Sequence, residues 1–272
     1  MSLKEDRVNS SVKVLACPVC HHHFSHFWNS EGKAVSAFGY GLDFRLLPRD
    51  SNRLSDIATC PNCFFTYRTQ DFQTRVPENL KLVVNSSAYQ SIFVVESSEE
   101  RRARAQLGLL RVLEAKGLNP RDLGIMGLKG SWTARELGAT RTEQELLEKA
   151  DSYLDDALRR GLTKGDPAMV MYLLGEINRR RESFLRAREM LTFLGNNPRY
   201  RYPSLLLTVL IEEEDPTPYW SQHSPERMEL NSTKFKGLFP PLRSIPPRKT
   251  EFSPDELREG QEQSDGDDLR KF

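Results

Sequence analysis

Apolar residues recur every three or four positions between residues 97 and 214, which predicts a series of amphipathic helices. The first of these stripes consists of Ala103, Leu107, Leu110 and Leu113. Further stripes follow helix-start signals at Asn119–Pro120, Thr142, Asp166–Pro167, Ser183 and either Pro203 or Ser204. Two starts have the pattern of a capping box, Ser97 with Glu100 and Thr142 with Glu145. Short turns between the stripes predict an antiparallel helical array over residues 99–214.

The spacing of small residues indicates how the helices of this region pack. Leu174–Gly175 is followed twelve residues later by Ala187, and Pro198 comes near the end of that helix. This spacing is typical of a tetratricopeptide repeat, in which small residues let two helices cross closely. A weaker match links Gly138 to Ala150. We therefore expect a tetratricopeptide-like array, with a plain helical bundle as the alternative. In the second helix, glycines are expected to lower helix stability at Gly124, Gly127 and Gly130.

The pattern before residue 76 is different and favours short strands. Residues 13–75 contain strand-like runs at Lys33–Tyr40, Phe44–Leu47 and Phe64–Thr69. Ten of the 25 aromatic residues lie between Phe24 and Phe72, as a small module with little core requires. Residues 76–98 are predicted as a connector, in which LKLVV and SIFVV form short strands or packed extended chain.

The two ends of the chain are polar. Residues 1–12 are predicted as a flexible lead-in, and residues 215–272 as a proline-rich, largely disordered tail. The tail contains one apolar run, FKGLFPPL at residues 235–242, which is a docking motif, a segment that packs back on the helices, or a linker. The predicted fold class is therefore α+β and mainly α, with a small zinc-ribbon-like β module at residues 13–75 before the tetratricopeptide-like helical array and the tail.

All four cysteines of the chain lie in two CxxC pairs, Cys17 with Cys20 and Cys60 with Cys63. A tight turn in each pair places two sulfurs on one ion, and the second pair completes a tetrahedral site. We expect one structural zinc ion per chain, bound by all four thiolates and with no open position for water. A rubredoxin-like iron site has the same ligands, and disulfide or redox use is the remaining alternative.

Four of the five histidines lie next to the first pair: His21, His22, His23 and His26. Four roles are open to these histidines. They could form a second metal site, replace a cysteine as a ligand, donate a hydrogen bond to a metal-bound sulfur, or be exposed polar residues. Because four cysteines already complete a tetrahedral site, we expect exposed polar residues.

Charge and composition narrow the classes of function. The net charge is +1, and residues 1–75 contain nine Lys or Arg against seven Asp or Glu, so four thiolates on zinc leave this module about neutral. A surface that follows nucleic-acid phosphates normally has a clear positive excess, which argues against nucleic acid. No apolar stretch of the sequence is long enough to span a membrane. The N-terminus also lacks the apolar region of a secretory signal. These features, with reduced cysteines, predict a cytoplasmic location.

Arginines gather at residues 101–104, 159–160 and 179–181 of the predicted helices. These clusters either bind acidic segments of a partner or are ordinary solvated helix faces, and interspersed acidic residues favour the second interpretation. Metal-hydrolase, phosphate-loop, dinucleotide-binding and zinc-deaminase motifs are absent from the sequence, so we expect no enzymatic activity.

Three segments carry a resemblance to a family: CPVCHHHF at residues 17–24, TCPNCFFTYRTQDF at 59–72 and MYLLGEINRRRESFLRAREML at 171–191. Over roughly residues 13–195 the chain resembles an uncharacterised bacterial family, domain of unknown function 2225. The resemblance implies zinc binding by the four cysteines and no recognised activity. We call the turn around each CxxC pair a knuckle. The family usually has glycine directly after the second cysteine of each pair, where this chain has His21 and Phe64. We therefore expect strained or differently turned knuckles.

The predicted function is a zinc-binding, non-enzymatic interaction module, in which the helical array binds a protein or peptide partner. A nucleic-acid-binding zinc ribbon and a rubredoxin-like electron-transfer protein are the alternatives.

Overall fold

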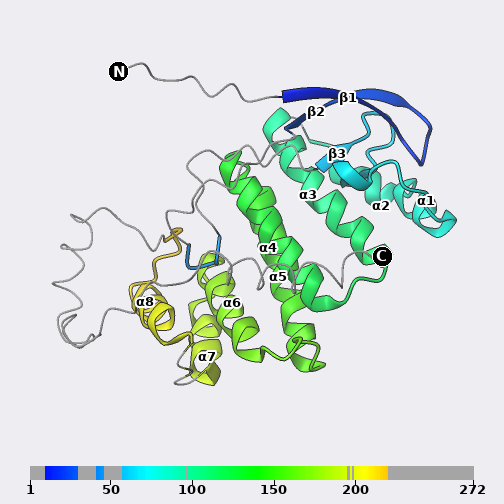
Figure 1. Cartoon of the computed structure of the whole chain (residues 1–272). Coiled ribbons are helices and arrows are strands. Elements are labelled where there is room, and N and C mark those ends of the chain that lie inside the picture. Colours follow the sequence, from blue (N-terminus) through cyan, green and yellow to red (C-terminus); the bar gives the residue numbers. More distant parts are fainter. Residues whose placement is uncertain are drawn as a thin grey trace, which may run out of the picture. The chain divides into compact units, whose positions relative to one another are not determined.

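The computed structural model describes residues 10–29, 41–45, 57–95, 97–194, 197 and 199–219. It is mainly helical with two small antiparallel strand pairs, so the predicted fold class is confirmed (Figure 1). Several predictions concern segments outside these ranges: the strand at Lys33–Tyr40, residues 1–9 of the lead-in, Pro198, and the tail from residue 220 with its FKGLFPPL run.

Two β-hairpins make up the strand region of the described chain. Strand β1 (Ser10–Ala16) pairs with β2 (His23–Asn29), and β3 (Ile57–Thr59) pairs with β4 (Thr66–Arg68). Each hairpin turns through one CxxC pair, and β4 leads into the short 3-10 helix η2 (Thr69–Asp71). Strand β1 thus begins inside the segment predicted as a lead-in. The described part of the predicted strand Phe44–Leu47 is a tight turn instead.

The connector between hairpins and array is helical, so its prediction as strands or extended chain is wrong. It contains α1 (Glu78–Val84), α2 (Ser87–Gln90) and the 3-10 helix η3 (Ser91–Phe93). Two pairs of large apolar residues, Leu80 with Val84 and Tyr89 with Phe93, are four positions apart and buried. Because this spacing puts both members of a pair on one helical face, burial against the core favours helix over strand.

Within the described residues, six longer helices follow the connector. They are α3 (Ser98–Ala115), α4 (Pro120–Glu136), α5 (Thr140–Arg159), α6 (Pro167–Arg180), α7 (Phe184–Leu194) and α8 (Arg201–Glu212). The side chains of Ser97, Asn119 and Asp166 accept hydrogen bonds from backbone N–H groups three residues later, which confirms three predicted helix starts. Helix α8 begins at Arg201, two or three residues before its predicted start at Pro203 or Ser204.

Thr142 does not cap α5, contrary to the prediction. The helix begins at Thr140, and Thr142 is buried within its first turn. Its hydroxyl donates a hydrogen bond to the Glu100 carboxylate of α3. The capping-box pattern at Thr142 therefore reflects a contact between two helices that are distant in sequence.

Two hydrophobic cores hold these elements together. The N-terminal core joins both hairpins to α1–α4 through residues such as Leu15, Phe65, Phe72, Leu80, Phe93 and Leu110. The C-terminal core joins α4–α8 through residues such as Leu128, Leu154, Leu174, Ile177, Ala187 and Leu207. Helices α4 and α5 contribute to both cores, so the hairpins and the helical array share one continuous interior. None of the helices that the structure describes is long and apolar enough to cross a membrane.

The small residues of the tetratricopeptide-like pair lie where α6 and α7 approach each other. A Cβ atom on Gly175 would lie 3.1 Å from Leu191 Cδ2 of α7, and Ala187 is fully buried. Val170, Leu173, Leu174 and Ile177 are buried on α6, as predicted.

Glycines in α4 serve close packing against α5. Gly124, Gly127 and Gly130 are three positions apart and therefore lie along one side of the helix. A Cβ atom on Gly124 would come within 2.5 Å of Leu154 Cγ, whereas one on Gly127 would lie 3.3 Å from Ala150 Cβ. The residues that lower intrinsic helix stability thus let the two backbones approach closely.

Gly124→Ala is expected to lower the free energy of unfolding by about 1–3 kcal/mol, because the added methyl group overlaps Leu154 and part of the core must move. Gly127→Ala is the matched control. Its methyl group would lie 3.3 Å from both Ala150 Cβ and Leu146 O, which is tight but leaves no overlap like that with Leu154, and alanine gains about 1 kcal/mol in helix propensity, so the loss should be smaller. Urea denaturation of both variants checks this difference. Equal losses would show that α4 and α5 are not packed as described.

The arginine clusters have a role that neither prediction anticipated. Arg104, Arg179 and Arg180 are buried and form ion pairs with Glu145, Glu176 and Glu143. The exposed arginines fit the solvated-face interpretation: Arg101 and Arg102 lie near the start of α3, and Arg159 and Arg160 at the end of α5 pair with Asp155 and Asp156. Three of the eight clustered arginines are therefore used in ion pairs inside the protein.

Candidate metal centre

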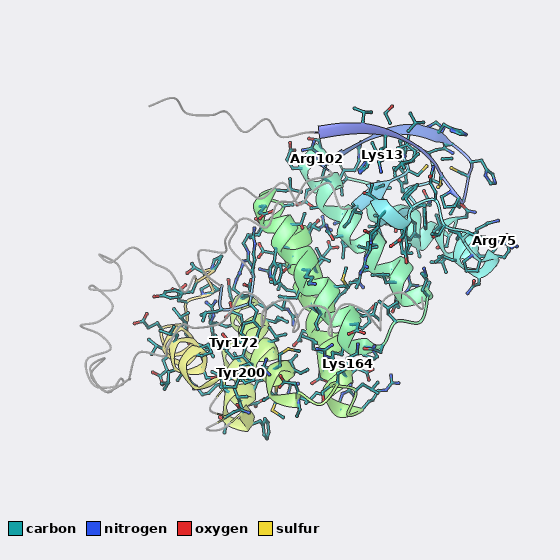
Figure 2. The ribbon with its side chains drawn as sticks, viewed as in Figure 1. Lys13, Arg75, Arg102, Lys164, Tyr172 and Tyr200 are labelled. Atoms are coloured by element: carbon teal, nitrogen blue, oxygen red, sulfur yellow. The ribbon has the colours of Figure 1, made fainter. Side chains whose placement is uncertain are left out.

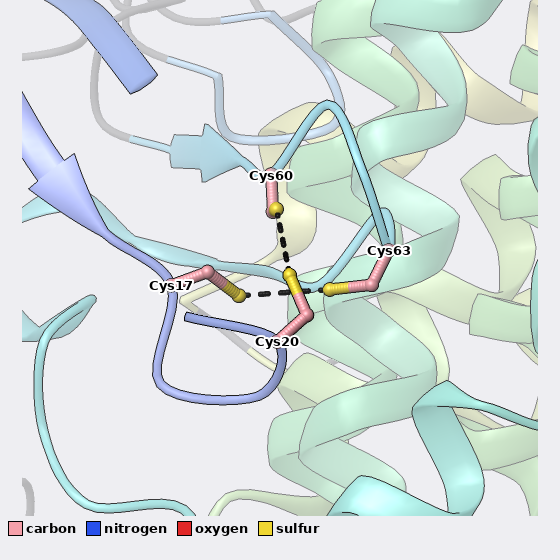
Figure 3. Close-up of side chains that lie close together, drawn as sticks. All are labelled: Cys17, Cys20, Cys60 and Cys63. Carbon is pink, nitrogen blue, oxygen red and sulfur yellow. Dashed lines mark hydrogen bonds between the residues drawn. The ribbon is translucent and has the colours of Figure 1, made fainter. Parts of the chain in front are cut away.

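The two hairpin turns bring the four predicted cysteines together (Figure 3). Their Sγ atoms all lie within 4.8 Å of one another. Two contacts join the two hairpins: Cys17 Sγ to Cys63 Sγ at 3.5 Å, and Cys20 Sγ to Cys60 Sγ at 3.6 Å. Cys17, Cys60 and Cys63 are buried, and Cys20 is partly exposed.

This arrangement has the dimensions of a tetrahedral metal site. Four sulfurs about 2.3 Å from a central zinc ion would lie about 3.8 Å apart at the corners of a tetrahedron. The two contacts between the hairpins are slightly shorter than that value, and all pairs stay within 4.8 Å. The donor set and its geometry therefore fit one metal ion held entirely by protein ligands.

The backbone of each knuckle follows the same path. In the first, Cys17 N–H donates to His22 O and His21 N–H donates to Cys17 O, both at 2.9 Å. In the second, Cys60 N–H donates to Phe65 O and Phe64 N–H donates to Cys60 O, again at 2.9 Å. Two turns with identical hydrogen bonding thus present their cysteines in equivalent ways.

Both knuckles have a positive φ at the residue directly after their second cysteine, which is not glycine in this chain. His21 has φ 61° and Phe64 has φ 58°, in the left-handed region that favours glycine. The expected strain is therefore present, while the two knuckles are turned alike. The second knuckle offsets its strain by packing, since the Phe64 ring stacks on Phe93 with centroids 4.9 Å apart. The His21 side chain is exposed.

Replacement of these two residues by glycine should have opposite effects. His21→Gly removes strain of about 1–2 kcal/mol and loses little packing, so it should raise the midpoint of thermal unfolding slightly. Phe64→Gly removes the same strain but also a stacked ring whose burial contributes about 1.5–3 kcal/mol, so it should lower the midpoint. Thermal unfolding of the metal-loaded variants tests the prediction. Stabilisation by both changes would contradict the role of the Phe64–Phe93 stack.

Contacts between the sulfurs change their proton affinities. The hydrogen bond with Cys63 lowers the pKa of Cys17 to about 5, helped by the backbone amides of Cys20 and Val19. The same contact raises the pKa of Cys63, because the two sulfurs share one proton. Burial raises the pKa of Cys60 to about 11. The buried cluster thus retains protons at neutral pH that a divalent cation would displace, since the thiolate is the metal ligand.

Residues of the connector hold the second knuckle in place. The Gln90 side chain donates to Cys63 O at 2.9 Å, and Tyr89 OH donates to Phe64 O at 2.9 Å. With Phe93 against Phe64, α2 and η3 support the knuckle through both backbone and side chain. None of these three residues was predicted as part of the site. The four-residue spacing of Tyr89 and Phe93 was the available signal for a helical face.

The histidines near Cys20 do not add to the cysteine cluster. His21, His22 and His23 are exposed, as expected for polar residues on a knuckle. His26 instead shares a hydrogen bond between its Nε2 and Thr69 Oγ1 at 3.1 Å, which joins the first hairpin to η2. Within the described ranges, the four cysteines are the one group of metal-ligating residues close enough to share an ion.

Comparison with models of protein families shows that residues 11–209 match a family described as "Uncharacterized protein conserved in bacteria (DUF2225)". The match spans both knuckles, the connector and the helices through most of α8, and it confirms the predicted resemblance. Searches of curated proteins and of solved structures gave no match.

Proposed function

The chain belongs to the uncharacterised bacterial family DUF2225, and we propose that it is a zinc-binding, non-enzymatic protein-interaction module. In this proposal the metal ion stabilises the two hairpins, and the helical array binds a protein or peptide partner in the cytoplasm.

The observation that carries the metal part is the closed set of four sulfurs. Two equivalent knuckles contribute two thiols each, and all Sγ atoms lie within 4.8 Å. Structural zinc sites have four protein ligands, whereas catalytic sites keep one position for water or substrate. The expected chemistry of the bound ion is therefore structural. Zinc is favoured because it takes tetrahedral thiolate ligands without a redox change.

The interaction part is supported by the architecture behind the hairpins. Helices α3–α8 pack mainly against their neighbours in sequence, as in arrays that bind partners on an extended surface. Arg104, Arg179 and Arg180 form internal ion pairs, which favours a protein partner over nucleic acid. Weak retention on heparin would agree with this choice, and strong salt-dependent retention would favour nucleic acid.

Metal content per chain, measured by elemental analysis on tag-free protein together with thiol titration, tests the proposed site. The expected result is one zinc ion per chain and four thiols that react only after a chelator is added. One iron ion with visible charge-transfer absorption would replace the proposal by rubredoxin-like electron transfer. Absence of any metal, with thiols reactive from the start, would overturn the metal site.

A further inference from the structure

A short turn between the two knuckles is docked on the helices. Residues 41–45 form this turn, in which Phe44 N–H donates to Gly41 O at 2.9 Å and Gly41 N–H donates to Arg45 O at 2.8 Å. Leu42 and Asp43 are each only 4% exposed. Leu42 N–H also donates to Tyr219 O, which follows α8. The turn is thus held by elements far from it in sequence.

Three consecutive side chains of the turn contact three different kinds of group. Asp43 Oδ2 accepts a hydrogen bond from Arg135 Nη1 of α4 at 3.3 Å. Arg45 forms an ion pair with Glu136, the next residue of α4. An acid and a base of the turn therefore meet a base and an acid of the helix.

The side chain of Phe44, between the two charged residues, packs against two tyrosines. Phe44 stacks on Tyr172 of α6, with ring centroids 4.9 Å apart and planes 24° apart. Its ring also lies 6.1 Å from Tyr200, just before α8, and the two tyrosines are themselves stacked at 5.7 Å. Figure 2 shows Tyr172 and Tyr200 side by side at this end of the array. The acidic, aromatic and basic side chains of the turn, in that order along the chain, thus each contact a complementary group on the helices.

We propose that Arg135, Glu136, Tyr172 and Tyr200 form a peptide-recognition site, which Asp43–Phe44–Arg45 occupies within the chain and which a partner segment with the same acid–aromatic–base triplet occupies when it displaces them. This inference rests on the proposed interaction function and specifies the surface and the partner chemistry.

Unused hydrogen-bond donors support a site that accepts more than this turn provides. Tyr172 OH and Arg135 Nη2 are buried and have no hydrogen-bond partner in the part of the chain that the structure describes. The same holds for Nε and Nη1 of Arg180, whose Nη2 shares Glu143 Oε1 with Arg135. A longer peptide supplies backbone carbonyls or a further carboxylate to such donors, which favours acceptors next to the triplet.

The docked turn also carries a strain that an external peptide avoids. Phe44 has φ 60°, a left-handed conformation that is unfavourable for an aromatic residue. Such strain at a position held by surrounding contacts is typical of functional segments. A peptide that is not joined to the two knuckles at its ends has more freedom to place the same three side chains with a relaxed backbone, so it competes with the internal turn.

A fluorescent peptide that contains residues 41–45, GLDFR, with two flanking glycines at each end, tests the proposal by anisotropy. The double variant Asp43→Ala/Phe44→Ala of the full chain frees the site. It is expected to bind the peptide at least ~10-fold more tightly than the wild type does, because the internal turn lowers the competent fraction. The control peptide GLAAR should not bind. Addition of Arg135→Gln to the double variant should weaken binding at least ~10-fold.

Hydrogen exchange on the wild type supplies a second readout that needs no variant. Excess GLDFR peptide should speed amide exchange at residues 41–45 and leave α6 protected. If the double variant keeps its helical circular dichroism and its metal but does not bind the peptide, the inference is wrong. If it fails to fold, unchanged exchange in the wild type with peptide overturns the inference. Metal content on the same samples tests the proposed metal function separately.

Discussion

Cys60→Ser is expected to abolish stoichiometric metal binding and to unfold both hairpins together with part of the helical region. Serine does not replace a thiolate ligand at neutral pH, and the apparent binding energy of a structural zinc site is of order 10–16 kcal/mol. Because Phe65 and Phe72 share the N-terminal core with Leu107 and Leu110 of α3, loss of the hairpins should also destabilise α1–α3. The C-terminal core of α4–α8 should persist.

Elemental analysis, far-ultraviolet circular dichroism and regional hydrogen exchange measure these three effects. His22→Ser is the matched control, because it changes an exposed side chain in the other knuckle and leaves all four thiols. The control should keep one metal ion and full helicity. If Cys60→Ser retained one metal ion per chain, a closed four-sulfur site would be excluded. If it lost all helicity, the C-terminal core would not be independent of the hairpins.

The second large effect is expected at a fully buried ion pair in α6. Arg179 donates from Nε and Nη2 to both carboxylate oxygens of Glu176, at 2.8 Å each. Its Nη1 donates to the carbonyl oxygens of Asp215 and Thr217, which follow α8. Arg179→Met leaves a buried carboxylate without its partner and should lower the free energy of unfolding by about 3–5 kcal/mol.

A double variant separates the charge from the packing. Arg179→Met/Glu176→Leu removes both charges and should recover most of the loss, because buried ion pairs are often no more stabilising than apolar residues of similar volume. The two carbonyls after α8 stay without their donor, so recovery is expected to be incomplete. Arg160→Ala, which breaks an exposed pair with Asp156, should change stability by only about 0–1 kcal/mol. Urea denaturation measures all three variants, and an equal loss in the single and double variants would contradict this explanation.

The pH dependence of Arg179→Met provides a further check of the same pair. Burial raises the pKa of Glu176 above its ordinary value even with Arg179 present. A carboxyl group whose pKa is higher in the folded than in the unfolded protein costs stability as pH rises through that folded pKa. Without Arg179 the folded pKa should rise further. The deficit of Arg179→Met relative to wild type should therefore shrink as pH is lowered from 7 towards 5.

The sequence by itself determined the features that depend on neighbouring residues. Ser97, Asn119 and Asp166 cap helices because each side chain bonds an N–H only three residues away. The CxxC spacing likewise determines a tight turn with two sulfurs on one side. With only four cysteines in the chain, the partners of Cys17 and Cys20 were also predictable, and the structure brings all four together.

The tertiary structure alone decided the features that depend on distant elements. Gly124 looks like a weak point in a helix until Leu154 occupies the space beside it. Arg179 looks like a surface charge until the carbonyl oxygens of Asp215 and Thr217, 36 and 38 positions away, accept hydrogen bonds from its Nη1. Thr142 has the pattern of a cap but bonds Glu100, 42 positions away.

The physical reason is the range of the interactions involved. Caps, turns and helical periodicity arise within about five residues, so the sequence carries them directly. Burial, close helix approach and charge pairing depend on what another segment places nearby, and that segment lies dozens of residues away. The metal centre was therefore predictable from its ligands, whereas the support from Tyr89 and Gln90 and the docking of residues 41–45 on α4 and α6 became visible only in the folded chain.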